Sequence, residues 1–364
     1  MLLKNIIDEI EKFAPLAYQE SYDNCGLLTG HQEQEITGAI LCLDCIEAVV
    51  EEAIQKKCNL IIAHHPIIFS GLKKLNGNTY IERTIIKAIQ NNIAIYACHT
   101  NLDNVKLGVN QKIANKLGLI NTQILAPKKS MLKKLVTFVP STHLENVRNS
   151  LFEAGAGNIG NYDHCSFALE GMGSFRGNEQ SNPFIGTKGT LSLEKEIRLE
   201  LIFETIHESK IIAALKQHHP YEEVAFDIYT LENKYQNIGS GMIGELETPT
   251  SEIAFLEKLK TIFNVKFIKH TPLLNNPIKK VALCGGSGSF LLNNAINSKS
   301  DIYISSDFKY HEFFDSENKI LIADIGHYES EQFTPEIFYE IISNKFPTFA
   351  SYFTETNTNP VNYI

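Results

Sequence analysis

Short apolar segments alternate with segments of helical periodicity at both ends of this chain. Leu60 to Ala63 form one such apolar segment, and Pro66 prevents it from continuing. Further strands are expected at residues 36–43, 93–98, 279–284, 301–305, 320–325 and 347–353, and helices at 3–13, 46–57, 80–91, 108–117, 251–263 and 331–344. This alternation predicts an α/β body with mostly parallel sheets flanked by helices.

The middle of the chain follows a different order. Residues 134–230 predict a strand, a helix, two strands, a helix and a strand, with a Gly/Asn/Ser-rich loop at 171–189 between the middle strands. That order is ferredoxin-like. The segment 233–244 has the composition of an exit linker. We therefore expect a split body, with its first half at 1–127, an inserted domain at 128–238 and its second half at 239–364.

Composition narrows the class of protein. The chain has 364 residues, a net charge of -9 and a pI near 5.8, which argues against a nucleic-acid partner because such partners favour dense Lys/Arg surfaces. No apolar run reaches the ~18 residues that would predict a membrane span. The start of the chain reads as an amphipathic helix rather than a signal peptide. The seven cysteines lie mostly in apolar runs, which predicts reduced thiols and a cytoplasmic location.

Histidines and carboxylates follow three of the predicted strands. The pairs are His64 with His65, His99 with Asp103, and His327 with Glu331. In open α/β sheets, ligands bind outside the carboxyl ends of the strands. Imidazoles together with carboxylates suit zinc, iron, manganese, nickel or cobalt.

These residues predict a hydrolytic centre with two divalent cations. Paired ions need several ligands and a bridging carboxylate, and they activate water. Glu331 or Asp103 would bridge the ions or orient that water, and His99 would bind Asp103 or contact a substrate. Each residue alone also has a structural interpretation, since His327 could cap a helix and Asp103 could begin the helix at 108–117.

A glycine-rich segment and a polar segment supply candidates for substrate binding. Residues 285–289, which include Ser287, could hold a phosphate on backbone amides or simply form a tight turn. Lys309 and His311 follow the strand at 301–305 and could face the same crevice. Asp307 could join them or cap a helix.

Several longer motifs occur together. They are Tyr22-Asp23-Asn24-Cys25-Gly26-Leu27, His64-His65-Pro66, His99-Thr100-Asn101-Leu102-Asp103, Asp307-Phe308-Lys309-Tyr310-His311 and Gly326-His327-Tyr328-Glu329-Ser330-Glu331. In this order they resemble the GTP cyclohydrolase I type 2 family, also called the Nif-three-like proteins. Tyr22 stands where that family usually has Trp, and Ser305-Ser306-Asp307 stands where it usually has Thr-Gly-Asp. The inserted segment resembles the PII-like, CutA-like insert of longer bacterial members.

The resemblance carries expectations about assembly and activity. It implies a dinuclear metal site with the ligands His64, His65, Asp103, His327 and Glu331, and a ring-shaped homohexamer. It also implies a small-molecule substrate such as the nucleotide GTP, whose purine-type ring a metal-activated water would open. The alternative is a non-enzymatic metal-binding adaptor or ligand sensor that acts through its inserted domain.

Overall fold

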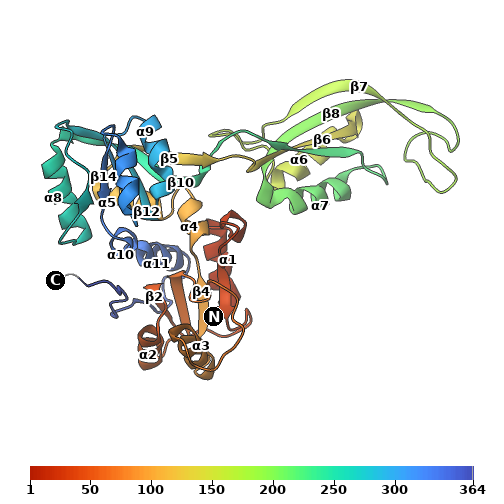
Figure 1. Cartoon of the computed structure of the whole chain (residues 1–364). Coiled ribbons are helices and arrows are strands. Elements are labelled where there is room, and N and C mark those ends of the chain that lie inside the picture. The colour runs from red at the N-terminus through yellow and green to blue at the C-terminus, as the bar shows by residue number, and fades with distance from the viewer. Residues whose placement is uncertain (363) are drawn as a thin grey trace. The chain divides into compact units, whose positions relative to one another are not determined.

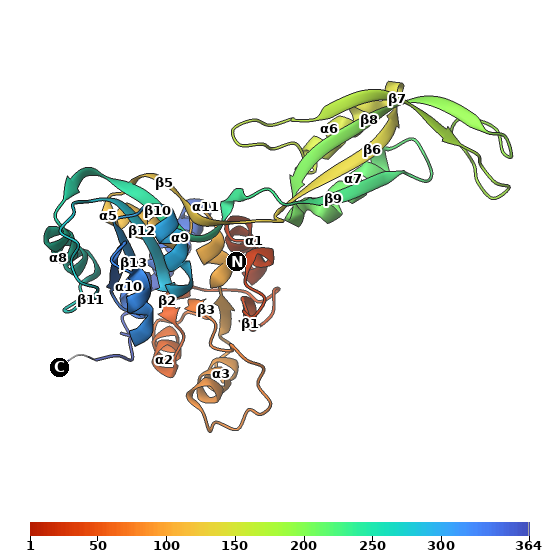
Figure 2. The same ribbon diagram turned by 45° about the horizontal axis from the view of Figure 1, so that its top comes forward.

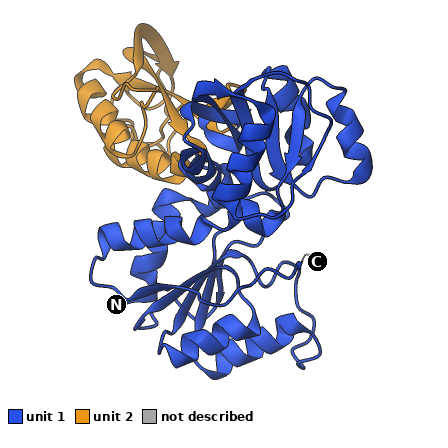
Figure 3. Cartoon of the chain, turned by 90° about the vertical axis from the view of Figure 1, so that its left-hand side faces the viewer, with its two compact units in different colours: residues 1–127, 236–364 blue, residues 128–235 orange. Residues whose placement is uncertain are grey.

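The computed structural model describes residues 1–362 and 364. The chain forms two compact units (Figure 3), one made of residues 1–127 and 236–364 and the other of residues 128–235. The second boundary therefore falls after Tyr235, whereas the sequence placed it at 238/239. The division into domains expected from the sequence stays a prediction.

The first sheet of unit 1 contains five strands in the order β1-β4-β3-β2-β15. Their bounds are β1 Gly26–Thr29, β4 Ala94–Ala97, β3 Leu60–His65, β2 Ala39–Asp44 and β15 Ser351–Phe353. β15, β2, β3 and β4 are parallel, and β1 is antiparallel to β4. The register places Asp44 beside His65 at the carboxyl end of this sheet.

Helices cover both faces of the first sheet (Figure 1). α2 (Glu47–Gln55) and α3 (Tyr80–Gln90) pack together against one face, while α11 (Thr334–Lys345) contacts β2 and β3 and packs on α1 (Leu3–Phe13). Buried residues of the strands and of α2 and α3 form one apolar cluster: Ile40, Cys42, Ile61, Ala63, Ile95, Val49, Val50, Ala53, Ile85 and Ala88 belong to it. The strands are buried on both faces, which explains their continuous apolar sequence.

The second sheet of unit 1 contains six strands in the order β11-β14-β13-β12-β10-β5. Their bounds are β11 Lys269–His270, β14 Leu321–Asp324, β13 Ile302–Ser306, β12 Ile278–Ser287, β10 Tyr235–Thr250 and β5 Ile120–Lys128. β12, β13 and β14 are parallel, whereas β10 runs antiparallel to β12 and β11 runs antiparallel to β14. The helices of this half are α5 Val109–Leu117, α8 Glu252–Phe263 and α9 Leu292–Asn297, together with the short α4 Thr100–Asn104 and α10 His327–Glu331. The prediction of an α/β body with helices on its sheets is confirmed.

The prediction of a linker at 233–244 is wrong, because most of this segment belongs to the long strand β10. Glycines in β10 made it resemble a linker, but they serve close packing. A Cβ at Gly239 would lie 2.3 Å from the carbonyl oxygen of Ala126, and one at Gly244 would lie 3.1 Å from that of Ile120. Both contacts are with β5, a strand that the sequence analysis missed.

Unit 2 contains a four-stranded antiparallel sheet in the order β7-β8-β6-β9 (Figure 2). Its elements in chain order are β6 Leu132–Pro140, α6 Leu144–Glu153, β7 Phe167–Phe175, β8 Ser192–Glu204, α7 Glu208–His218 and β9 Phe226–Leu231. β7 begins later than the predicted 161–169 because a turn with His164 at φ 53° precedes it. The ferredoxin-like character of this unit stays a prediction.

None of the helices in the described part of the chain is both long and apolar enough to cross a membrane.

Candidate metal centre

The five predicted ligands converge at the carboxyl ends of strands from both sheets of unit 1. His64 and His65 are the last two residues of β3. Asp103 lies on α4, which begins shortly after β4, and His327 and Glu331 are the first and last residues of α10, which follows β14 (Figure 1). Strand ends that carry short helices therefore bring together side chains that are far apart in the sequence.

One group of ligand atoms contains two imidazoles and a carboxylate. Nε2 of His65 lies 3.0 Å from Oε2 of Glu331, and Nε2 of His327 lies 3.1 Å from the same oxygen. The two Nε2 atoms are 3.4 Å apart. These three side chains could hold one metal ion.

A second group uses the other oxygen of Glu331. Nε2 of His64 lies 3.7 Å from Oε1 of Glu331 and 3.6 Å from Oδ1 of Asp103. These gaps are too long for hydrogen bonds, but two atoms that each lie about 2.0–2.2 Å from a tetrahedral zinc ion are about 3.3–3.6 Å apart. Nε2 of His64 and Oδ1 of Asp103 are buried and have no hydrogen-bond partner in the described chain. Since buried polar atoms are normally satisfied, the unpaired atoms fit a cation site.

A glycine makes room for the carboxylate that the two groups share. Gly286 has φ +61°, and a Cβ at this position would lie 2.3 Å from Oε1 of Glu331. The neighbouring Ser330 accepts a hydrogen bond of 2.9 Å from the backbone N–H of Gly286, which fastens α10 to β12. Glu331 itself is 3% exposed.

Hydrogen bonds at Nδ1 orient each of the three imidazoles. Nδ1 of His64 lies 2.9 Å from the carbonyl oxygen of Cys98, and Nδ1 of His65 lies 2.7 Å from Oδ1 of Asp44. Nδ1 of His327 lies 2.6 Å from Oδ2 of Asp307. Carbonyl and carboxylate oxygens accept, so Nδ1 carries a proton in each ring and Nε2 faces the cluster.

Two of these supporting acids were not recognised from the sequence. Asp44 was not considered, although it ends β2 and lies beside His65 in the register. A search for acids at the ends of neighbouring strands would have included it. Asp307 was expected to bind substrate or cap a helix, whereas it holds His327 from a backbone conformation with φ 59°.

The neighbouring groups of the cluster shift one another's pKa values strongly. Burial lowers the pKa of His65, but hydrogen bonds to Asp44 and Glu331 outweigh this and raise it to about 10. Burial likewise lowers the pKa of His327, and its contacts with Glu331 raise it to about 9. Burial raises the pKa of Glu331, yet its contacts with the imidazoles of His327, His64 and His65 bring it well below its usual range. Burial, and then the charge of Glu331, raise the pKa of Asp103.

His99 lies next to the cluster, but its hydrogen-bond partner differs from the predicted one. Its ring centroid is 5.2 Å from that of His64 and 5.3 Å from that of His65. Nδ1 of His99 lies 2.9 Å from Oδ1 of Asp23, so its partner is Asp23 rather than Asp103. The other oxygen of Asp23 accepts from the backbone N–H of Thr100 at 3.0 Å. The motif around Asp23 therefore serves to orient His99.

Two cavities adjoin the cluster, and both are lined in part by His99 and His327. The larger, of about 760 Å³, is also lined by His65, Phe69 and Lys269. The smaller, of about 420 Å³, is bordered by Asp103, Glu331 and Ser287. Among the described residues that line them, neither Lys309 nor His311 is present, so the structure does not bring these two predicted substrate ligands to the cluster.

The glycine-rich segment 285–289, for which a phosphate loop and a tight turn were both considered, begins as part of a strand. Gly285 to Ser287 continue β12. The backbone N–H of Gly285 donates to Oδ1 of Asn110 at 2.9 Å, and that of Gly286 donates to Ser330. These amides are therefore occupied by the protein's own side chains.

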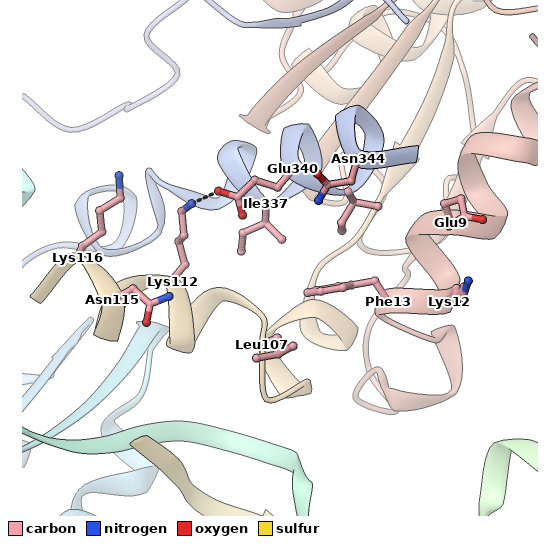
Figure 4. A pocket seen from close by; sticks show the side chains of 11 residues that line it. Glu9, Lys12, Phe13, Leu107, Lys112, Asn115, Lys116, Ile337, Glu340 and Asn344 are labelled. Atoms are coloured by element: carbon pink, nitrogen blue, oxygen red, sulfur yellow. Dashed lines mark hydrogen bonds and ion pairs between the residues drawn. The ribbon is translucent and has the colours of Figure 1, made fainter. Parts of the chain in front are cut away.

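Another cavity of unit 1, of about 670 Å³, lies among α1, α5 and α11 (Figure 4). Lys112 and Glu340 form an ion pair of 2.6 Å on its lining. Apolar side chains such as Phe13 and Leu107 contribute to the rest. Since the described lining includes none of the five candidate ligands, this cavity has no part in the metal centre.

Comparison with known proteins assigns the chain to a family. The model of the Duf34/NIF3 family (NGG1p interacting factor 3) matches residues 1–360. The chain belongs to the Duf34/NIF3 family. The family expected from the sequence motifs is thus confirmed.

Family members with similar sequences and structures extend over the whole chain. A Bacillus subtilis protein named GTP cyclohydrolase 1 type 2 homolog is 37% identical and covers 99% of this chain and 98% of its own length. A protein of the same name from Halalkalibacterium halodurans is 39% identical, over 89% of this chain and 88% of its own. The crystal structure of a Bacillus cereus protein related to NIF3 superposes with a TM-score of 0.85 at 37% identity, over 100% of this chain and 99% of that one.

Proposed function

We propose that this chain is a metal-dependent hydrolase with two divalent cations that share Glu331. The observation that carries the proposal is the position of that carboxylate, because Oε2 faces His65 and His327 while Oε1 faces His64. In this proposal His65, His327 and Glu331 hold one ion, and His64, Asp103 and Glu331 hold the other. Bound ions of this kind supply an acidified water and a clamp for substrate oxygens.

His99 is the proposed proton carrier of the site. Asp23 accepts from Nδ1 of His99, which leaves Nε2 as the nitrogen that would exchange a proton with a substrate. Burial raises the pKa of Asp23, but its hydrogen bonds from His99 and Thr100 bring it below its usual range, which keeps it an acceptor. The proton is taken up at Nε2 of His99, beside both cavities.

The proposed substrate is GTP, whose purine-type ring would be opened with loss of formate. Support comes from the names of the relatives and from the size of the larger cavity, since ligand pockets usually have volumes of about 300–1,000 Å³. A toroidal homohexamer, implied by the sequence motifs, is part of the same proposal and is checked by the mass of the protein in solution.

The test measures formate release from GTP with zinc, iron(II), manganese or cobalt. We expect turnover that requires metal, with a large loss of kcat in His99→Gln and unchanged metal content. Stoichiometric metal binding without turnover for any of these ions would defeat the GTP hydrolase proposal and favour the adaptor alternative. Absence of metal binding would defeat both the hydrolase proposal and the metal-binding adaptor alternative.

A further inference from the structure

The C-terminal segment 354–361 runs directly to the candidate metal centre. It follows β15, which is parallel to β2 with Phe353 opposite Leu41. The N–H of Thr354 continues this pairing by donating to the carbonyl oxygen of Leu41 at 3.0 Å. The direction of β2 then leads the segment to the strand end that carries Asp44.

A buried acid of α2 anchors the beginning of this segment. Glu52 is 8% exposed and accepts hydrogen bonds from the hydroxyls of Thr354 at 2.6 Å and Thr356 at 2.8 Å. It also accepts from the backbone N–H of Glu355 at 2.9 Å. The segment is therefore fixed before it reaches the site.

Thr358 connects the segment to Asp44, the hydrogen-bond partner of the candidate ligand His65. It is 7% exposed, and its hydroxyl donates to Oδ2 of Asp44 at 2.9 Å. Oδ1 of the same carboxylate accepts from Nδ1 of His65 at 2.7 Å. Each oxygen of Asp44 thus has a different partner, and the two bonds together fix the plane of the carboxylate.

The residues after Thr358 border the site itself. Nδ2 of Asn359 donates to Oε1 of Glu329 at 2.9 Å, which attaches the segment to α10. Asn359, Pro360 and Val361 line the larger cavity, in common with His65 and His327. The segment therefore contacts α10, which supplies two of the candidate ligands, as well as Asp44.

We infer that Thr358 is a positioning residue of the metal centre, which fixes Asp44 and through it the ring of His65. Residues 358–361 are thereby a part of the site. Loss of the hydroxyl leaves Oδ2 of Asp44 without this donor, so the carboxylate can turn and His65 loses its fixed direction. The inference rests on the proposed function only in that His65 serves as a metal ligand.

Zinc affinity tests the inference, measured by competition with a chromophoric chelator. Thr358→Val keeps the shape of the side chain, and we expect it to weaken zinc binding by about 3- to 10-fold, somewhat less than the 10–100-fold typical of a direct partner of a ligand. Thr358→Ser restores the affinity because it restores the hydroxyl. The matched control is Thr356→Val, which removes a threonine hydroxyl from the same segment without touching Asp44, and it leaves the affinity unchanged.

A double-mutant cycle with Asp44→Asn shows whether the effect passes through Asp44. If it does, Thr358→Val has no further effect in the Asp44→Asn background. Equal effects in both backgrounds, or equal losses in Thr358→Val and Thr356→Val, would overturn the inference.

Nitrogen-15 shifts of the His65 ring in the metal-free protein provide a readout that does not need an ion. We expect Thr358→Val, but not Thr356→Val, to shift the resonance of Nδ1, because this nitrogen donates to Asp44. An unchanged His65 spectrum would overturn the positioning role. Failure of the wild-type protein to bind any metal would instead overturn the proposed function, so the two failures are distinguishable.

Discussion

Nε2 of His65 lies 3.0 Å from Oε2 of Glu331, although 266 positions separate the two residues in the sequence. The contact joins the end of β3 in the first sheet to α10 beside the second. It places the carboxylate of Glu331 between the pair His65 and His327 and the pair His64 and Asp103. Most of the predictions below depend on this position.

Replacing Glu331 with Gln should remove at least one of the two proposed ions per chain. Gln keeps the shape of the side chain but loses the negative charge that both proposed ions share. Elemental analysis of the purified variant measures the metal content. Glu336→Gln is the control, because Glu336 pairs with Lys112 and Lys116 on the surface of α11 and α5. Retention of two ions with wild-type affinity in Glu331→Gln would rule out a bridging role.

Metal binding should strengthen as the pH rises from about 6 toward 9. The pKa values of His65 and His327 are raised to about 10 and 9 by their acidic neighbours, so both rings carry a proton that an incoming ion must displace at neutral pH. Titration calorimetry in buffers of different ionisation enthalpy measures the protons released. Binding that is independent of pH over this range, without proton release, would contradict the protonated state of the metal-free site.

Gly286→Ala should cost more stability than Gly118→Ala and should also reduce metal affinity. Both glycines have positive φ, +61° and +70°, so both substitutions carry a backbone penalty of about 1–3 kcal/mol. A Cβ at Gly286 additionally meets Glu331, whereas a Cβ at Gly118 has nothing within 4 Å. Denaturant unfolding and chelator competition give the two quantities. Equal losses in both variants, with zinc affinity intact, would show that Glu331 moves away without consequence.

The chemistry of the site was more predictable than its supporting contacts. The His64–His65 pair, Asp103, His327 and Glu331 could be proposed as ligands because each follows an apolar strand, and a strand end is a local property of the sequence. Asp44 and Asp23 could not be paired with their histidines in this way. Those choices depend on which strands become neighbours, and this is decided by long-range packing.

Glycine was the least predictable residue type. In β10 it resembled a linker, and in β12 it resembled a phosphate loop. In both places it admits another part of the protein, the backbone of β5 beside Gly239 and the carboxylate of Glu331 beside Gly286. The approaching atoms belong to distant segments, so a local pattern cannot distinguish these glycines from flexible ones.

Acid should destabilise the wild-type protein more steeply than Glu52→Gln. Burial raises the pKa of Glu52, but hydrogen bonds from Lys56, Thr354 and the backbone of Glu355 outweigh it and lower that pKa from 4.5 to about 2. A depressed pKa in the folded state means that Glu52 stabilises the fold above pH 4.5 and that this contribution is lost as the pH falls from about 4.5 to about 2. Thermal unfolding across this range measures the difference.

The control for this experiment is Glu51→Gln, since Glu51 pairs with Lys87 on the surface. Its acid sensitivity should match that of the wild type. Parallel pH profiles for the wild type and Glu52→Gln would show that the anchoring of the C-terminal segment does not depend on the charge of Glu52.

The candidate ligands lie on both sides of unit 2 in the sequence, with Asp103 before it and His327 and Glu331 after it. Since the ribosome makes the chain from its N-terminus, a nascent chain carries His64, His65 and Asp103 long before the shared carboxylate is synthesised. Thr358 follows later still. The full donor set exists only after Glu331 has been synthesised, so the proposed centre could take up its ions only after translation has passed this residue.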